Sequence, residues 1–116
     1  MSGSETECRP WGSFTVLEES TTYKVKRIEV KPQQKLSLQS HEHRHETWTI
    51  VAGVAHVRVG SKESELKSGE TTSVPKGALH RLENRTDNPV IVIEVQTGDY
   101  FGEDDIIRYD DLYARS

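Results

Sequence analysis

Short runs in which apolar and polar residues alternate, separated by turn residues, make up most of the chain. Alternation with a period of two is typical of β-strands with one buried face, and apolar residues at helical spacing are rare here. Strands are expected at residues 22–30, 36–40, 47–51, 54–59, 71–74 and 90–95, with one more around 11–17. Many short strands at regular spacing predict an all-β fold, either an antiparallel sandwich or a barrel.

The two ends depart from this pattern. Residues 1–8 are polar and acidic, and we expect a disordered tail there, followed by a single domain at residues 9–116. Only residues 104–115 are expected to hold helix, as a short C-terminal helical turn.

The strand at residues 22–30 raises a question of facing. If Ile28 and Val30 point into the core, Lys24 and Lys26 share their face, because side chains alternate along a strand. The alternative is a β-bulge near Lys26-Arg27 or an outward face, which would leave both lysines in water. A buried lysine pair is costly unless an anion meets it. Inward lysines would therefore imply an anionic ligand, and the strand alone favours the bulge or the outward face.

The composition bounds the class of protein. A chain of 116 residues is long enough for one hydrophobic core and too short for two. No apolar run approaches twenty residues, and the first eight lack the apolar stretch of a signal peptide, so no membrane segment is expected. The 19 acidic residues outnumber the 15 basic ones, which argues against nucleic-acid binding. Cys8, the single cysteine, rules out an intramolecular disulfide and favours a reducing, cytoplasmic location.

Residues 41–46, His-Glu-His-Arg-His-Glu, are dense in metal-ligating side chains. His41 and His43 would share one face of a strand. Glu46 lies three residues after His43, so a turn or bulge around Arg44-His45 is needed to bring its carboxylate back. With His80 from a second region, three imidazoles and a carboxylate would suit one divalent ion such as Zn, Mn, Co, Fe or Ni. The simpler interpretation is a solvated loop of mixed charge.

The second region resembles a motif of the cupin family. It reads Gly69-x5-Pro75-x-Gly77-x2-His80-x3-Asn84 and matches the second cupin motif completely. The first motif ends with Glu46-x6-Gly53 but departs from the general pattern. Gln33 stands where a glycine is usual, and only two residues separate His43 from Glu46, a shorter spacing that marks a subfamily.

Nearly the whole chain, residues 9–115, resembles the cupin domain of type II mannose-6-phosphate isomerases. In many bacteria that domain is the C-terminal part of a bifunctional mannose-1-phosphate guanylyltransferase. Thr47 departs from the histidine common at its position. The matching stretches outside the second motif are Arg9-Pro-Trp-Gly12, Tyr23-Lys-Val-Lys-Arg-Ile28, Leu36-Ser-Leu-Gln39, His41-x-His43-Arg44-x-Glu46-x-Trp48, Ile93-Glu-Val-Gln96 and Gly102-Glu-Asp-Asp105.

The resemblance implies a double-stranded β-helix, which is the jelly-roll barrel of cupins, with a metal ion held by His41, His43, Glu46 and His80. It implies interconversion of mannose 6-phosphate and fructose 6-phosphate, in which a proton moves between C1 and C2 through a cis-enediol and the ion acts as Lewis acid. Cupin barrels usually pair, so we expect a homodimer in which the strand around residues 11–17 adds to the partner's sheet edge.

The phosphate of such a substrate requires cations, which makes the inward facing of the two lysines the preferred one. The candidates for phosphate binding are Lys24, Lys26, Arg44 and Arg81. Gln39 and Gln96 are further candidates for contact with the sugar or for orienting other site residues.

The proton transfer requires a general base, and Glu94 is the candidate because it lies on the same strand face as Gln96. An ion pair between Glu94 and Lys24 or Lys26 is an equally good interpretation. Together with Glu94, the residues expected to take part in catalysis are Lys26 and Arg44. The acidic run at residues 102–105 is interpreted as structural, a helix cap.

Two alternative functions remain open. One is a non-catalytic module that binds a sugar phosphate and retains the metal, because a fold can keep its motif residues when it is reused. The other is an iron- or copper-dependent dioxygenase, against which inward lysines argue because that chemistry favours an apolar pocket.

Overall fold

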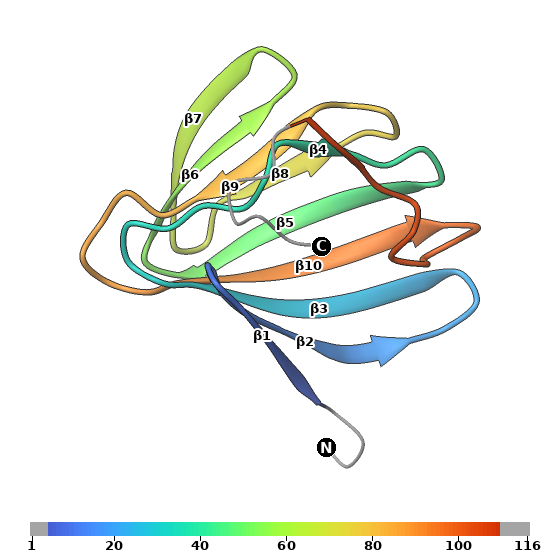
Figure 1. Ribbon diagram of the computed structural model, residues 1–116, viewed down its shortest axis with the longest axis horizontal. Helices are drawn as coiled ribbons and strands as arrows, with labels where there is room; N and C mark the ends of the chain where they lie inside the picture. Colours follow the sequence, from blue (N-terminus) through green and yellow to red (C-terminus); the bar gives the residue numbers. More distant parts are fainter. Residues whose placement is uncertain (1–4, 110–116) are drawn as a thin grey trace.

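A computed structural model describes residues 5–109, in which all of the helix or strand structure is strand (Figure 1). The strands are β1 (Thr6–Arg9), β2 (Gly12–Glu19), β3 (Tyr23–Val30), β4 (Gln39–Ser40), β5 (Arg44–Ala52), β6 (Val54–Val59), β7 (Lys62–Lys67), β8 (Thr71–Val74), β9 (His80–Glu83), β10 (Val90–Gly98) and β11 (Ile107–Arg108). The all-β prediction is confirmed. Across these described residues there is no helix with the length and apolar character needed to cross a membrane.

The strands form two antiparallel sheets. The larger has the order β1-β2-β3-β10-β5-β8 and the smaller the order β11-β4-β9-β6-β7. In Figure 1 the larger sheet occupies the lower part of the view and the smaller sheet the upper part. Strands far apart in the sequence become neighbours, since β10 pairs with β3 on one side and with β5 on the other. The three central strands of the larger sheet therefore come from widely separated parts of the chain.

The inward-facing rows of these three strands change from apolar to polar partway along. The buried residues are Lys24, Lys26, Ile28 and Val30 in β3, Arg44, Glu46, Trp48 and Ile50 in β5, and Val90, Val92, Glu94 and Gln96 in β10. The register aligns the changes, because Glu94 pairs with both Lys26 and Trp48 across the sheet. One end of the barrel is therefore apolar, and the other is lined with charged side chains.

The apolar end holds the hydrophobic core. Its buried members come from both sheets and are Trp11, Ile28, Val30, Trp48, Ile50, Ala55, Val57, Val74, Leu82, Val90 and Val92. Burial of this surface is the main favourable term in folding. The core therefore holds β3, β5 and β10 in place, and the other ends of these strands carry the polar residues.

The facing of β3 is now settled. Lys24 and Lys26 lie inside, 8% and 5% exposed, and the pairing of β3 with β10 runs without interruption. The register shift lies instead in the neighbouring strand β2, between Val16 and Glu18. The bulge near Lys26-Arg27 is wrong, and the inward facing that the resemblance favours is correct.

Several predicted boundaries are wrong. Thr6–Arg9 form β1, so the tail predicted at residues 1–8 is at most residues 1–5, of which 1–4 lie outside the described range. Because β1 covers one side of β2, the strand around residues 11–17 is not a free sheet edge. Residues 104–109 hold a turn and β11 rather than a helical turn, and residues 110–115 lie outside the described range.

Besides β1 and β11, two further strands were not expected, and one strand is shorter than predicted. Lys62–Lys67 form β7, an exposed, charged strand that is held by its pairing with β6 rather than by burial of alternate residues. His80–Glu83 form the short strand β9. Of the strand predicted at residues 36–40, only Gln39–Ser40 are strand.

Candidate functional site

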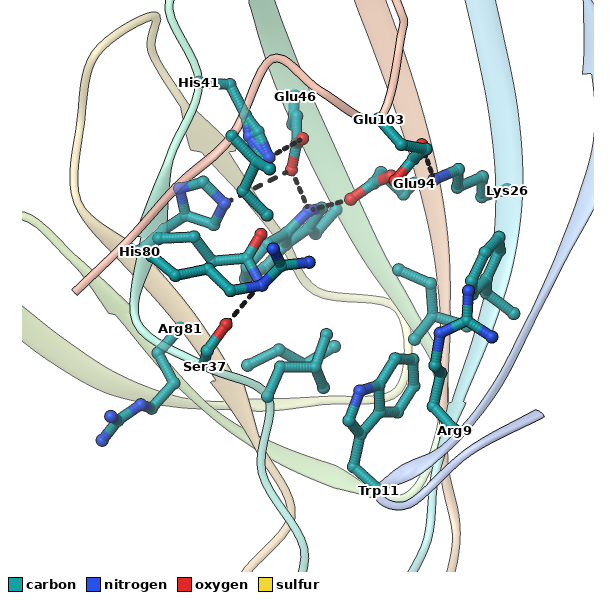
Figure 2. Close-up of a pocket in the computed structure, with 18 of the residues that line it drawn as sticks. Arg9, Trp11, Lys26, Ser37, His41, Glu46, His80, Arg81, Glu94 and Glu103 are labelled. Atoms are coloured by element: carbon teal, nitrogen blue, oxygen red, sulfur yellow. Dashed lines mark hydrogen bonds and ion pairs between the residues drawn. The ribbon is translucent and has the colours of Figure 1, made fainter. Parts of the chain in front are cut away.

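The polar end of the barrel contains a cavity of about 170 Å³. A single water needs only about 15 Å³, so this space admits a small ligand. Figure 2 shows the two halves of its wall, with Trp11 and Arg9 on one side and the histidines and carboxylates on the other. The charged or histidine side chains that line the cavity are Arg9, Lys26, His41, Arg44, Glu46, His80, Arg81, Glu94, Glu103 and Arg108.

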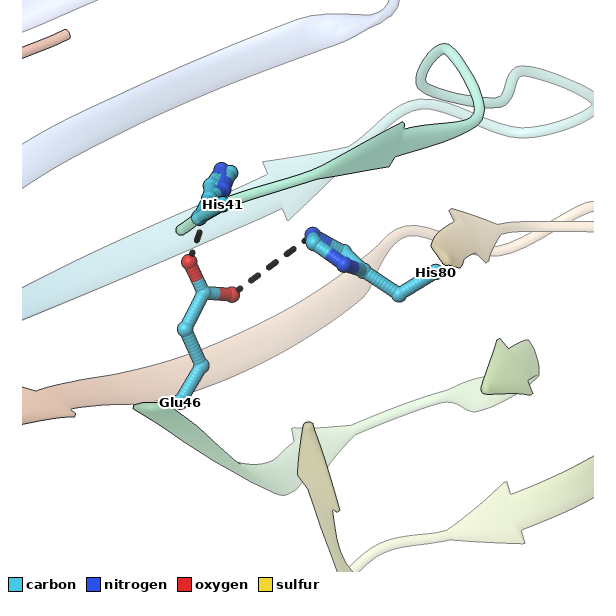
Figure 3. A group of neighbouring side chains, drawn as sticks. All are labelled: His41, Glu46 and His80. Atoms are coloured by element: carbon cyan, nitrogen blue, oxygen red, sulfur yellow. Dashed lines mark ion pairs between the residues drawn. The ribbon is translucent and has the colours of Figure 1, made fainter. Parts of the chain in front are cut away.

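His41, Glu46 and His80 converge in this cavity (Figure 3). The Nε2 atom of His41 lies 3.7 Å from Glu46 Oε2, and the Nε2 atom of His80 lies 3.9 Å from Glu46 Oε1. One ligand-type atom from each of the three residues can be chosen so that all lie within 4.8 Å of one another. Glu46 belongs to β5 and His80 to β9, while His41 follows β4, so the two sheets together build the group.

Hydrogen bonds indicate which nitrogen of each imidazole carries the proton. The Nδ1 atom of His80 is 3.1 Å from the carbonyl oxygen of Ala78, which can only accept, so Nδ1 donates and Nε2 presents a lone pair. Arg44 Nη2, which can only donate, lies 2.9 Å from His41 Nε2, so that atom also presents a lone pair. Both Nε2 atoms lie close to a Glu46 oxygen, 3.7 Å away for His41 and 3.9 Å for His80.

Both imidazoles are held neutral. Burial, together with the positive charges of Arg44 and of a protonated His80, lowers the pKa of His41 to about 3. Burial also lowers the pKa of His80, although its hydrogen bond to Ala78 opposes the change. Neutral imidazole is the form that coordinates metal ions.

Arg44 is the cation closest to this group. Its Nε atom donates to Glu46 Oε2 at 2.9 Å, while Nη2 occupies the lone pair of His41. The side chain is 5% exposed, and Nη1 has no hydrogen-bond partner within the described part of the chain. Arg44 thus compensates the buried carboxylate, and it lines the cavity with one guanidinium nitrogen unpaired within the described residues.

Two buried carboxyl groups meet at Trp48. Its indole Nε1 lies 3.1 Å from Glu46 Oε1 and 3.0 Å from Glu94 Oε1, so the two acids share one donor. Burial and the neighbouring Glu94 raise the pKa of Glu46 well above its usual value. Burial opposes ionisation of Glu94 as well, but the charge of Lys26 and the hydrogen bonds from Glu46 and Gln96 outweigh it and lower its pKa. Of these two carboxyl groups, Glu94 is therefore the one that favours the ionised form.

The buried lysines face a carboxylate from the segment that follows β10. Lys26 Nζ lies 2.8 Å from Glu103 Oε2, and Lys24 Nζ lies 3.7 Å from the same oxygen. The Lys26 side chain is 7% exposed, whereas that of Glu103 is 58% exposed. Burial opposes ionisation of Glu103, but Lys26 more than offsets it, so the pKa of Glu103 is lowered. The requirement that an anion meet inward lysines is thus met by the chain itself.

His43 is the predicted ligand that the structure does not bring to the group. Its side chain is 58% exposed and lies near Asp99 and Tyr100 instead. The backbone bends at Glu42 and His43, and regular alternation begins at Arg44, which therefore takes the inward position beside Glu46. The expected turn around Arg44-His45 is wrong, because β5 already begins at Arg44.

The remaining predicted residues divide between the cavity and its surroundings. Gln39 and Arg81 line the cavity, and in Figure 2 the guanidinium of Arg81 points away from His41 and Glu46. Gln39 Nε2 donates to Ser37. Gln96 is fully buried and does not line the cavity; its Nε2 donates to Glu94 Oε2 at 2.7 Å.

Among the residues that line the cavity, sequence reasoning did not assign Trp48 or Glu103 to the site. Trp48 was available from alternation, since it lies two residues after Glu46 on the same face. Glu103 had only an indirect signal, namely that two inward lysines require an anion. The acidic run at residues 102–105, interpreted as a helix cap, supplies that anion.

The three converging residues fit a divalent first-row ion. Two neutral imidazoles whose Nε2 atoms lie close to one carboxylate are a donor set that such ions favour. The Nδ1–H bond from His80 to Ala78 fixes its ring, as is usual for metal-binding histidines. Arg44 must leave its contact with His41 Nε2 for that nitrogen to coordinate, because the nitrogen has only one lone pair.

A family model described as "Mannose-6-phosphate isomerase C-terminal" matches residues 2–111. The xanthan biosynthesis protein XanB of Xanthomonas campestris pv. campestris (strain B100) is 45% identical over 108 residues, 93% of this chain and 23% of the relative. The mannose-1-phosphate guanylyltransferase ManC of Salmonella typhimurium is 44% identical over 107 residues, 92% of this chain and 22% of the relative. The chain thus spans less than a quarter of the length of these relatives.

Solved structures support the fold. A protein with a double-stranded beta-helix domain from Klebsiella pneumoniae aligns with a TM-score of 0.74 and 22% identity, over 96% of this chain and 90% of that one. The cupin-2 domain protein Rru_A2000 from Rhodospirillum rubrum aligns with a TM-score of 0.74 and 19% identity, over 90% and 80%. The predicted jelly-roll barrel is confirmed.

Proposed function

The chain belongs to the mannose-6-phosphate isomerase C-terminal family, and we propose that it is a metal-dependent isomerase that interconverts mannose 6-phosphate and fructose 6-phosphate. The observation that supports this best is the joining of two kinds of group in one polar end. His41, Glu46 and His80 suit a divalent ion, and the inward Lys26 beside Lys24 suits a phosphate. Such a charged cavity argues against a dioxygenase, because that chemistry favours an apolar pocket.

The relatives suggest the setting of this activity. Their names refer to xanthan biosynthesis and to guanylyl transfer onto mannose 1-phosphate. We infer that the chain handles a hexose phosphate on the way to a polysaccharide. A cytoplasmic location agrees with this, because the exposed thiol of Cys8 would stay reduced there.

The metal centre would be held by His41, Glu46 and His80. When bound, the ion supplies a Lewis acid for the oxygens at C1 and C2 of the substrate. Lys26 and Lys24 would bind the phosphate as point charges, and Arg44 would add a fork of donors. The other cavity-lining candidates, Arg81 and Gln39, would contact the sugar or its phosphate.

Glu94 is our candidate for the base that moves the proton between C1 and C2. It lines the cavity, and its lowered pKa favours the ionised form that can accept a proton. Its oxygens accept hydrogen bonds from Trp48 and Gln96, which fix the carboxylate. Gln96 thus positions the base instead of contacting the substrate. Lys26, whose charge helps to keep the pKa of Glu94 low, would then serve both in catalysis and in phosphate binding.

The test is an assay of mannose 6-phosphate conversion with protein stripped of metal and refilled with one divalent ion at a time. We expect turnover with at least one ion and a loss of about 100-fold or more in His80→Ala, which removes a ligand. Arg27→Met, on the outer face of β3, is the matched control and should keep full turnover.

The outcomes separate the candidate functions. Full metal occupancy without conversion, together with binding of mannose 6-phosphate, would contradict the isomerase and leave the binding module. Oxygen consumption that depends on iron or copper would instead indicate a dioxygenase. Turnover that persists after metal removal would contradict the proposed role of the ion.

A further inference from the structure

Arg44 places a guanidinium inside the group of metal-ligating atoms. Its Nε and Nη2 atoms each lie 2.9 Å from an atom of that group, Glu46 Oε2 and His41 Nε2 respectively. Two of the three ligand-type side chains are therefore engaged by a cation that the chain itself provides. His80, the third of these residues, has no hydrogen bond to Arg44 within the described part of the chain.

The contact with His41 excludes simultaneous coordination. A neutral imidazole nitrogen has one lone pair, which can accept a hydrogen bond or coordinate a metal ion but not both. Since His41 Nε2 accepts from Arg44, a metal ion gains that nitrogen only when the guanidinium leaves it. The positive charges of the Arg44 guanidinium and of a metal ion at His41 would also repel each other, because the two would lie close together.

We propose that Arg44 and the metal ion compete for His41 and Glu46, so that metal binding releases Arg44 to the anionic group of the ligand. This inference deepens the proposed function and rests on it for the nature of that group, a phosphate ester. Arg44 then binds the phosphate of the ligand and links metal loading to substrate affinity.

The surroundings of Arg44 favour its release toward the phosphate of the ligand. The side chain lines the same cavity as Lys26, and Nη1 already lacks a partner within the described residues. Arg44 also helps to lower the pKa of Glu103, the carboxylate that faces the lysines, so its charge already acts on that anion. A guanidinium released from Glu46 needs another anion, because a buried charge without a partner is costly.

Coupling of this kind must be reciprocal. If the metal ion raises the affinity for the phosphate ester, the phosphate ester raises the affinity for the ion by the same factor. A metal ion that only coordinated the ligand directly would give coupling that did not depend on Arg44. Replacement of Arg44 therefore distinguishes the two explanations.

The experiment measures Zn²⁺ affinity by competition with a chelator, with and without mannitol 1-phosphate. This ligand carries a phosphate ester and no carbonyl, so no turnover intervenes, and failure of the isomerase proposal would not affect the result. In the unmodified protein we expect the ligand to tighten Zn²⁺ binding about fivefold or more. In Arg44→Met we expect tighter Zn²⁺ binding in the absence of mannitol 1-phosphate. The ratio of the Zn²⁺ affinities with and without that ligand should fall to about one.

Arg44→Lys provides a second variant should Arg44→Met fold poorly. Lysine keeps the charge but lacks the fork that contacts both partners, so its Zn²⁺ affinity should also exceed that of the unmodified protein. Arg27→Met is the matched control and should behave as the unmodified chain. Zn²⁺ affinity that is unchanged or weaker in the Arg44 variants, or coupling that persists in them, would overturn the proposal.

Discussion

At the residue scale, the site depends on which of two adjacent side chains turns inward. His43 and Arg44 are neighbours, yet the bend at Glu42 and His43 sends the histidine to solvent and the arginine into the cavity. From Arg44 onward the strand alternates, which aligns Glu46 and Trp48 with it. The candidate metal-ligating set of the described residues therefore has two histidines and one carboxylate.

The first prediction separates the two histidine roles. His80→Ala should weaken Zn²⁺ binding by about 100-fold or more, because it removes a converging ligand. His43→Ala should change the Zn²⁺ affinity by no more than about twofold, because that side chain is 58% exposed and lies outside the group. Calorimetric titration of both variants measures the difference. A loss in His43→Ala as large as that in His80→Ala would restore His43 to the ligand set.

The second prediction concerns the protonation of His41 in metal-stripped protein. Its pKa is lowered to about 3, below the ordinary value of 6.5, so the ring should remain neutral as the pH falls from 7 to about 5. Ring resonances in an NMR titration report this directly. Arg44→Met should raise the pKa, because a neighbouring positive charge disfavours the imidazolium. Charging of His41 near pH 6.5 in the unmodified protein would contradict the buried environment described here.

At the scale of elements, the segment after β10 closes the polar end of the barrel. In Figure 1 it is drawn in red and runs from the end of β10 toward β4. Asp105 accepts hydrogen bonds from the backbone N–H groups of Glu42 and His43 at 3.1 and 3.0 Å, and β11 pairs with β4. This attachment holds Glu103 against the lysines of β3.

The third prediction follows from that contact. Because Glu103 engages Lys26 and Lys24, a phosphate ester must displace its carboxylate to reach them. Glu103→Gln should therefore tighten mannitol 1-phosphate binding to metal-stripped protein about fivefold, as a competing charge is removed. Asp104→Asn is the matched control, since that residue bonds to Tyr100 instead. Weaker binding in Glu103→Gln would mean that the carboxylate holds the ligand rather than opposing it.

The predictability of the elements follows from their composition. Strands β3, β6, β8 and β10 were predicted to within a few residues, because each is a short run rich in β-branched residues and bounded by turn residues. β7 has no such pattern, since its charged side chains are mostly exposed and only pairing with β6 holds it. The end of the chain resisted prediction for a similar reason, as its position depends on contacts with distant strands.

At the scale of the whole molecule, the barrel separates stability from function along its length. The apolar halves of β3, β5 and β10 form the core, and the polar halves of the same strands form the site. The sequence signalled His41, Glu46 and His80 through their spacing and resemblance to a family. It also offered Arg44 as a phosphate-binding and catalytic candidate. It did not signal the contacts of Arg44 with His41 and Glu46, because those depend on a bend that only the folded chain shows.

The fourth prediction concerns assembly. β1 lies at the edge of the larger sheet with mostly exposed residues, and such an edge is open to pairing with another strand. We propose that two copies pair through β1, in place of the strand around residues 11–17. Sedimentation should give twice the chain mass of 13.2 kDa, and removal of residues 1–8 should give a monomer. A monomeric full chain at tens of micromolar would contradict this assembly.

The central claim is that the cavity moves a proton between C1 and C2 of a hexose phosphate. The measurement that tests it most directly is deuterium incorporation from D₂O, followed by NMR, with metal-loaded protein and mannose 6-phosphate. We predict that deuterium appears at C2 of mannose 6-phosphate and at one position on C1 of fructose 6-phosphate. Incorporation should be lost in His80→Ala. A metal-loaded protein that forms no fructose 6-phosphate and leaves mannose 6-phosphate free of deuterium would contradict the account.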